Sequence, residues 1–197
     1  MKQVVAIHGG HVFSSYEEYL SHLRNYKVES LDHFQKKRWK DALQKELGNE
    51  YNVILPRMPS RENAKYVEWK IWFEKLTPFL EDGVIFVGHS LGGKFLAKYL
   101  SEEKFPKKIA ATFLIAAPFD RSTREHTDFV LPGALKLLRK QGGQIHLYHS
   151  KDDAIVSFDE FLRYQVALPQ AMAHVFENHG HFNQESFPEL VADIKNI

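Results

Sequence analysis

A serine between glycines lies where a predicted strand turns into a predicted helix, in Gly88-His89-Ser90-Leu91-Gly92-Gly93. The apolar run Val84–Val87 precedes this turn, and an amphipathic run over residues 94–100 follows it. A sharp turn of this kind lifts the serine hydroxyl above the sheet edge, and its neighbours must be small because they approach the next strand. The Leu91 N–H then lies at a helix start, unpaired and directed to where an oxyanion would form. The turn therefore predicts Ser90 as a nucleophile for acyl transfer, with the Leu91 N–H as one oxyanion donor.

A serine nucleophile needs a base that takes its proton, and the base needs an acid that orients it. In enzymes with this turn, the acid and then the base lie on loops that follow later strands. The loop after the fifth apolar run, Ser150–Val156, carries two carboxylates, and the loop after the sixth run, 178–182, carries two histidines. A further carboxylate follows the fourth run. The candidate acids and bases are Asp120, Asp152, Asp153, His179 and His181.

The histidines also suggest a metal site as an alternative, because His8 and His11 lie in the first loop and His179 and His181 in the last. However, the sequence holds no His-Glu-x-x-His motif and no cysteine, so it has neither of these familiar zinc signatures. The serine turn already explains the later histidine pair. We therefore expect no metal and no cofactor.

Composition narrows the class of protein further. The chain has 197 residues, and 26 Lys and Arg against 25 Asp and Glu give a net charge of +1. This length fits one domain, and a charge near zero gives no electrostatic footprint for nucleic acid. The absence of cysteine excludes disulfides and a cysteine nucleophile. The first apolar run is too short for a signal peptide and no run approaches a membrane span, so we expect a cytoplasmic protein.

The elements that must position these residues alternate along the chain as strands and helices. Six apolar runs, mostly continuous rather than alternating, are typical of strands in a parallel sheet with helices on both faces. They are Val4–Ile7, Tyr51–Leu55, Val84–Val87, Ile109–Ala117, Ile145–Tyr148 and Ala173–Phe176. The pattern predicts a three-layer α/β/α sandwich with about six mainly parallel strands.

Helix signals lie between these runs. Capping boxes are predicted at Ser15–Glu18 and Ser157–Glu160, and a helix is predicted to open at Pro132 and close at Gly142-Gly143. One apolar helix face is expected from Trp69, Trp72, Phe73, Leu76 and Leu80. The basic cluster over residues 36–40 is interpreted as a solvated helix face rather than a nucleic-acid site.

Four motifs together resemble the small α/β-hydrolases of the retinoblastoma-binding-protein-like serine hydrolase group. They are Ile7-His8-Gly9, Gly88-His89-Ser90-Leu91-Gly92, Ser150-Lys151-Asp152-Asp153-x-x-Val156 and Gly180-His181-Phe182, and they span nearly the whole chain. Fuller members of the superfamily place the serine turn after their fifth strand, whereas here it follows the third predicted strand. The resemblance therefore implies an α/β-hydrolase fold trimmed at its N-terminal edge.

The resemblance also implies roles for individual residues. Ser90 would be the nucleophile, Asp153 the acid, because it precedes Val156 by three residues, and His181 the base, because it lies between a Gly and a Phe. The group often has proline after that valine, where this chain has a serine, and often has glycine in place of His179. By analogy with the superfamily's His-Gly-x turn, the second oxyanion donor would be the Gly10 N–H, with Gly9 next. His8 is expected to shape that loop.

The expected function is hydrolysis of a small carboxylic ester through an acyl-enzyme, by a single domain over residues 1–197 with no separate lid domain. The pocket walls are expected from residues 11–32 and 121–131. An amidase or peptidase with the same triad is an alternative, as is a catalytically silent binding protein. The Leu-x-Cys-x-Glu motif proposed for contact with the retinoblastoma protein cannot occur without cysteine. A small-molecule substrate is the expected partner, with no nucleic acid and no membrane.

Overall fold

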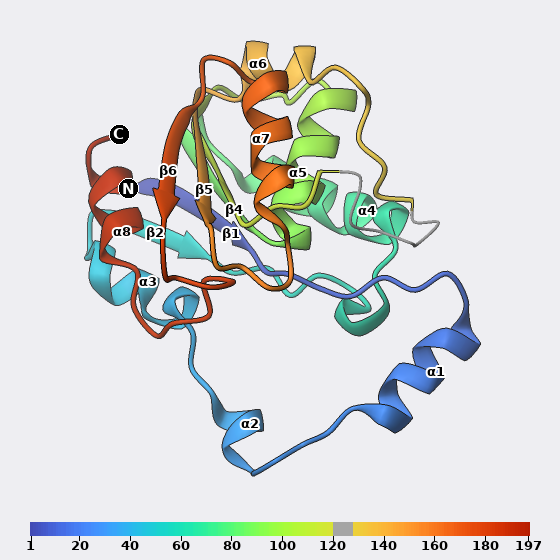
Figure 1. The fold of residues 1–197 in the computed structure, drawn as a ribbon. Coiled ribbons are helices and arrows are strands. Elements are labelled where there is room, and N and C mark those ends of the chain that lie inside the picture. Colours follow the sequence, from blue (N-terminus) through green and yellow to red (C-terminus); the bar gives the residue numbers. More distant parts are fainter. Residues whose placement is uncertain (120–127) are drawn as a thin grey trace.

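The computed structural model describes residues 1–119 and 128–197 and contains a parallel sheet at its centre (Figure 1). Its six strands lie in the order β2-β1-β3-β4-β5-β6, and every neighbouring pair is parallel. The strands are β1 (Lys2–Ile7), β2 (Tyr51–Ile54), β3 (Val84–His89), β4 (Ile109–Ile115), β5 (Gln144–Ser150) and β6 (Met172–Phe176). Each overlaps one of the six apolar runs, so the predicted fold class is confirmed.

Helices cover both faces of the sheet, which explains why the central strands are apolar on both sides. Among the described residues, two helices pack on one face and four on the other (Figure 1). The first pair is α3 (Trp39–Leu47) and α8 (Pro188–Lys195); the second set is α4 (Tyr66–Leu76), α5 (Leu91–Glu102), α6 (Lys136–Gln141) and α7 (Phe158–Ala167). Because all strands are parallel, the loops after β1, β3, β5 and β6 meet at one carboxyl edge. The candidate residues are on these loops, except Asp120, which follows β4 in the sequence and lies outside the described residues.

A segment over residues 14–37, which we call the arm, extends away from the layers (Figure 1). It carries α1 (Tyr16–Asn25) and α2 (Asp32–Gln35), and neither helix buries a residue. The Ser15 hydroxyl accepts from the Glu18 N–H, as a capping box requires, but the Glu18 carboxylate bonds Ser14 rather than Ser15. Two short 3₁₀ turns, Arg61–Asn63 and Thr77–Phe79, complete the elements.

Some sequence predictions at helix starts were wrong. Ser157 makes no side-chain cap for α7: the Glu160 N–H donates to the Ser157 main-chain carbonyl at 3.0 Å, and the buried Glu160 carboxylate accepts from the Phe119 N–H. The helix expected to open at Pro132 begins only at Lys136, although it ends at Gly142 as predicted. The sequence signals therefore predicted that these helices exist but did not predict how each one begins.

Two predictions about exposure also need correction. On α4, Trp69 and Phe73 are fully buried as expected, but Trp72 is 48% exposed and faces away from the core. The basic cluster was interpreted as a solvated face, yet only its first part is exposed, and Trp39 is buried against Phe187. Lys40 is half-buried and contacts His89. Among the described residues, no helix is long and apolar enough to cross a membrane.

Candidate active site

Ser90 lies in the turn between β3 and α5 with backbone angles φ 55° and ψ −124°. A non-glycine residue rarely adopts such a positive φ, and the surroundings must hold it there. The Ser90 N–H donates to the Ile115 carbonyl at 2.8 Å, which ties the turn to the neighbouring strand. A Cβ on Gly92 would lie 2.4 Å from the Ile7 oxygen, and one on Gly88 would lie 2.6 Å from the Gly92 oxygen. Only glycine fits at these two positions, as the sequence predicted.

The loop after β1 passes directly beside Ser90. A Cβ built on Gly9 would lie 3.1 Å from the Ser90 Cβ, so the backbone of this loop borders the hydroxyl. In the part of the chain that the structure describes, the Gly10 N–H and the Leu91 N–H make no hydrogen bond. Two unpaired N–H groups on adjoining turns are what an oxyanion hole requires.

His8 fixes the shape of this first loop. Its Nδ1 bonds the Gly9 carbonyl at 2.7 Å, and its Nε2 accepts from the Met58 N–H at 3.0 Å. Both ring nitrogens are therefore occupied within the loop, and burial lowers the pKa of the imidazole. This matches the expectation that His8 shapes the loop.

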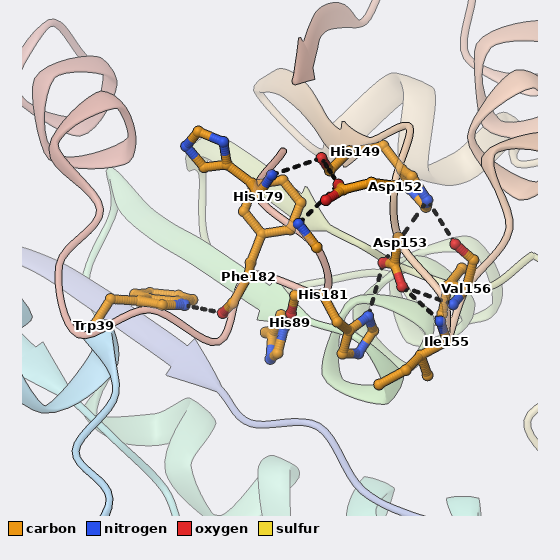
Figure 2. Close-up of polar contacts among 12 residues, drawn as sticks. Trp39, His89, His149, Asp152, Asp153, Ile155, Val156, His179, His181 and Phe182 are labelled. Atoms are coloured by element: carbon orange, nitrogen blue, oxygen red, sulfur yellow. Dashed lines mark hydrogen bonds and ion pairs between the residues drawn. The ribbon is translucent and has the colours of Figure 1, made fainter. Parts of the chain in front are cut away.

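The Asp153 carboxylate contacts the His181 ring (Figure 2). Asp153 Oδ2 lies 2.8 Å from His181 Nδ1, and Asp153 Oδ1 accepts from the Ile155 and Val156 N–H groups at 2.8 and 3.0 Å. The Asp153 side chain is fully buried. Burial alone would raise the pKa of this carboxyl, but the His181 contact and the two N–H donors outweigh it and lower the pKa. The carboxylate stays charged and holds the His181 Nδ1 proton in place.

Asp152 and His179, the rival candidates in these two loops, have other partners. Asp152 Oδ1 accepts from the Ser150 hydroxyl and from the Gly180 N–H, so Asp152 ties the two loops together. The His179 ring lies against Phe176, with ring centroids 4.2 Å apart, and points away from Asp153 (Figure 2). Asp120, the third candidate acid, lies outside the described residues.

His89, in the turn that carries Ser90, contacts the loop that carries His181. His89 Nε2 donates to the His181 carbonyl at 2.8 Å, and the two ring centroids are 5.0 Å apart. His181 is thus held beside the residue that precedes Ser90. Among the described residues no hydrogen bond joins the Ser90 hydroxyl to His181; such contacts commonly tighten only when substrate binds.

Two residues that support these loops, His149 and Lys40, were not identified from the sequence. His149, on β5, donates from Nε2 to the Val156 carbonyl at 2.9 Å and so closes the loop that carries Asp153. Lys40 donates to His89 Nδ1 at 3.1 Å. Burial, with the charges of Arg61 and Arg38, lowers the pKa of the Lys40 ammonium to about 7. The one sequence signal for Lys40 was its place in the basic cluster beside a tryptophan.

In the described ranges, one group of side chains approaches the spacing of metal ligands: His146, His174 and Asp193, with ligand atoms within 4.8 Å of one another. These atoms are engaged with each other, since His146 Nδ1 bonds His174 Nε2 at 3.1 Å and His174 pairs with Asp193 at 3.5 Å. Asp193 also accepts from the Tyr148 hydroxyl. These contacts link β5 and β6 to α8, and none of the candidate catalytic residues takes part in them.

The free energy of unfolding is expected to fall in acid through His146. Burial, and next the nearby His174, lower its pKa from 6.5 to about 4, so between these values the unfolded chain binds a proton that the folded chain does not. The contribution of His146 to the free energy of unfolding, about 3 kcal/mol, is therefore fully present above about pH 6.5 and is lost as the pH falls toward 4. The His146→Gln variant should show a shallower loss in denaturant titrations over this range. Parallel curves for wild type and His146→Gln would contradict this, and His33→Gln, at an exposed histidine, is the control.

The predicted pocket walls fall only partly within the described residues, so they stay a prediction. In the first segment, α1 stands apart from the sheet, and in the second, Phe129 and Leu131 are buried in the core, while residues 120–127 lie outside the described ranges. A cavity of about 860 Å³ between α6 and α7 is lined by Leu135, Leu162 and others, but not by the candidate site residues. We therefore do not assign it to the substrate.

Similar solved structures support the class of fold that these features define. The ydeN gene product of B. subtilis has a TM-score of 0.74 at 18% identity, over 100% of this chain and 98% of that chain. A serine hydrolase involved in carbazole degradation (CarC) has a TM-score of 0.64 at 14% identity, over 100% of this chain and 90% of that chain. An esterase domain from a Rhodothermus marinus protein has a TM-score of 0.59 at 17% identity, over 98% of this chain and 82% of that chain. The chain has the α/β-hydrolase fold.

The family follows from the sequence itself. The serine hydrolase family matches residues 26–190, and the chain belongs to that family. It is therefore an enzyme of the hydrolase class, and the predicted resemblance to α/β-hydrolase serine hydrolases is confirmed. No curated protein matches the chain.

Proposed function

We propose that this chain hydrolyses small carboxylic esters through an acyl-enzyme on Ser90, with His181 as base and Asp153 as acid. The observation that carries the proposal is the 2.8 Å contact between His181 Nδ1 and the buried Asp153 carboxylate, on the edge where Ser90 forms its strained turn. Asp153 fixes the tautomer in which His181 Nε2 is free to accept the serine proton.

The first step is attack of the Ser90 oxygen on the ester carbonyl while its proton passes to His181 Nε2. The Leu91 and Gly10 N–H groups stabilise the tetrahedral oxyanion, each by about 3 kcal/mol. His181 then gives the proton to the leaving alcohol. Water, deprotonated by His181, attacks the acyl-enzyme, and the acid product leaves as Ser90 recovers its proton. The reaction uses no cofactor and no metal.

We propose a shallow, open substrate site in a single domain over residues 1–197 without a lid domain. The arm stands apart from the sheet, and the cavity between α6 and α7 does not reach Ser90. A site without a deep apolar wall gives little binding energy for a long acyl chain, since each buried CH₂ contributes about 0.8 kcal/mol.

The substrate class is tested with p-nitrophenyl esters of increasing acyl length, together with matched thioesters and anilides. The value of kcat/KM is expected to be highest for acetate or butyrate and to fall for decanoate and palmitate. An optimum at long chains would contradict the open site. Faster cleavage of anilides than of esters would make the enzyme an amidase that uses the same three residues.

A further inference from the structure

The start of α3 is bound to the loop that carries His181. Four consecutive carbonyls of this loop, those of residues 181–184, accept hydrogen bonds from one small region. The donor–acceptor pairs are His89 Nε2 to His181 O (2.8 Å), Trp39 Nε1 to Phe182 O (3.0 Å), Arg38 Nη1 to Asn183 O (2.6 Å) and Trp39 N to Gln184 O (2.9 Å). We call Arg38, Trp39 and Lys40 the α3 clamp; Lys40 contacts the loop through His89. Figure 2 shows Trp39 reaching the Phe182 carbonyl from the side opposite Asp153.

Lys40 favours the tautomer of His89 that carries the proton on Nε2. Lys40 Nζ lies 3.1 Å from His89 Nδ1. An ammonium can only donate and the His181 carbonyl can only accept, so His89 Nδ1 accepts from Lys40 and the proton lies on Nε2. Only that tautomer can donate to the His181 carbonyl, which accepts and never donates. Lys40 therefore acts on the His181 backbone through His89.

The first turn of α3 is itself held in place. The Arg38 N–H donates to the Asp41 carboxylate at 2.8 Å, and the Lys40 ammonium lies 4.3 Å from the centre of the Trp39 ring. Trp39 is 1% exposed. Donors on a buried, capped helix turn are fixed in position, which makes them suitable for holding a loop.

The loop itself has little regular structure to hold it. It runs from the end of β6 at Phe176 to the start of α8 at Pro188 without a helix or strand. Phe182, next to His181, has φ 51° and is fully buried, a conformation that persists only where its surroundings enforce it. The contact with Asp153 fixes the His181 ring, whereas the α3 clamp fixes the backbone from which that ring extends.

We propose that the α3 clamp positions His181 for proton transfer, an inference that rests on the proposed role of His181 as base. Displacement of a reacting group by about 1 Å can lower the rate by about 10²-fold. The residues of the clamp are positioning residues, because they touch His181 through its main chain and the loop. Their loss should lower kcat and leave KM nearly unchanged.

The first experiment compares Lys40→Met with Lys36→Met on p-nitrophenyl acetate. Both variants remove one lysine of the same basic cluster, but Lys36 is exposed and Lys40 contacts His89. We expect kcat to fall by about tenfold or more in Lys40→Met, with KM within about twofold, and no change in Lys36→Met. A wild-type kcat in Lys40→Met would overturn the proposal.

A second variant separates positioning from a general structural role. The side-chain amide of His89→Gln carries its N–H donors permanently, so it needs no lysine to fix a tautomer. Lys40→Met should therefore cost less than about twofold when combined with His89→Gln, although it costs about tenfold alone. Equal losses in both backgrounds would mean that Lys40 does not act through His89, and would overturn the proposal.

Hydrogen exchange of the peptide 177–187, read by mass spectrometry, gives a measure that does not need activity. Uptake should rise in Lys40→Met and stay at the wild-type level in Lys36→Met; unchanged uptake in Lys40→Met would overturn the proposal. A wild-type enzyme with no esterase activity would contradict the proposed function, and this exchange measurement would then decide whether the clamp holds the loop.

Discussion

Replacement of Ser90 by alanine is expected to lower kcat by about 10⁴-fold or more on p-nitrophenyl acetate. The proposed reaction needs the Ser90 oxygen as the atom that bonds the acyl group. Loss of the nucleophile in a serine hydrolase removes the covalent route and leaves only what the oxyanion donors and binding supply. A fluorophosphonate probe should label the wild type at Ser90 and leave Ser90→Ala unlabelled, as read by mass spectrometry.

The control for this variant is Ser60→Ala. Ser60 also has a positive φ, of 48°, but it is exposed and caps no helix with its side chain. We expect Ser60→Ala to keep wild-type kcat and labelling. Retained activity or labelling in Ser90→Ala, with circular dichroism like that of the wild type, would overturn the assignment of the nucleophile.

Replacement of Asp153 by asparagine is expected to lower kcat by about 10⁴-fold. The amide can still accept from the Ile155 and Val156 N–H groups through its oxygen, so the loop should keep its shape. Its NH₂ group would then face His181 Nδ1 and favour the tautomer with the proton on Nε2, the nitrogen that must accept the Ser90 proton. Steady-state kinetics on p-nitrophenyl acetate and the rate of probe labelling both measure this loss.

Asp152→Asn is the matched comparison, because it makes the same chemical change one residue away. Asp152 uses its Oδ1 to accept from Ser150 and Gly180, and an asparagine oxygen can do the same. We expect a loss below about fivefold. A severe loss in Asp152→Asn with a mild one in Asp153→Asn would reverse the assignment of the acid.

The sheet could be predicted from the sequence because its strands are buried on both faces. β3 is buried along its whole length, and its first four residues form a continuous apolar run that is visible without tertiary information. Helix starts were less predictable. Glu160 matched a capping box, but its carboxylate bonds Phe119, a residue 41 positions away that no local pattern reveals.

The site was predictable where chemistry restricts residue type locally. The serine turn needs small residues at fixed offsets, and these are visible in the sequence. Two neighbouring aspartates, by contrast, differ only in which way each side chain points, and the resemblance alone favoured Asp153 over Asp152. The role of Lys40 was hidden because its partner, His89, is 49 positions away. A lysine in a basic cluster is more often solvated.

The backbone of Ser90 has a consequence for how the molecule tolerates change. A non-glycine residue held at φ 55° costs about 1–3 kcal/mol, out of a total stability of about 5–15 kcal/mol for an ordinary domain. A glycine at this position would relieve that strain but would also remove the hydroxyl. Under the proposed mechanism, folding and catalysis therefore prefer different residues at position 90, and the need for a nucleophile would favour serine there. In a homologue that no longer needs the hydrolase activity, glycine at this position would be expected to raise the free energy of unfolding.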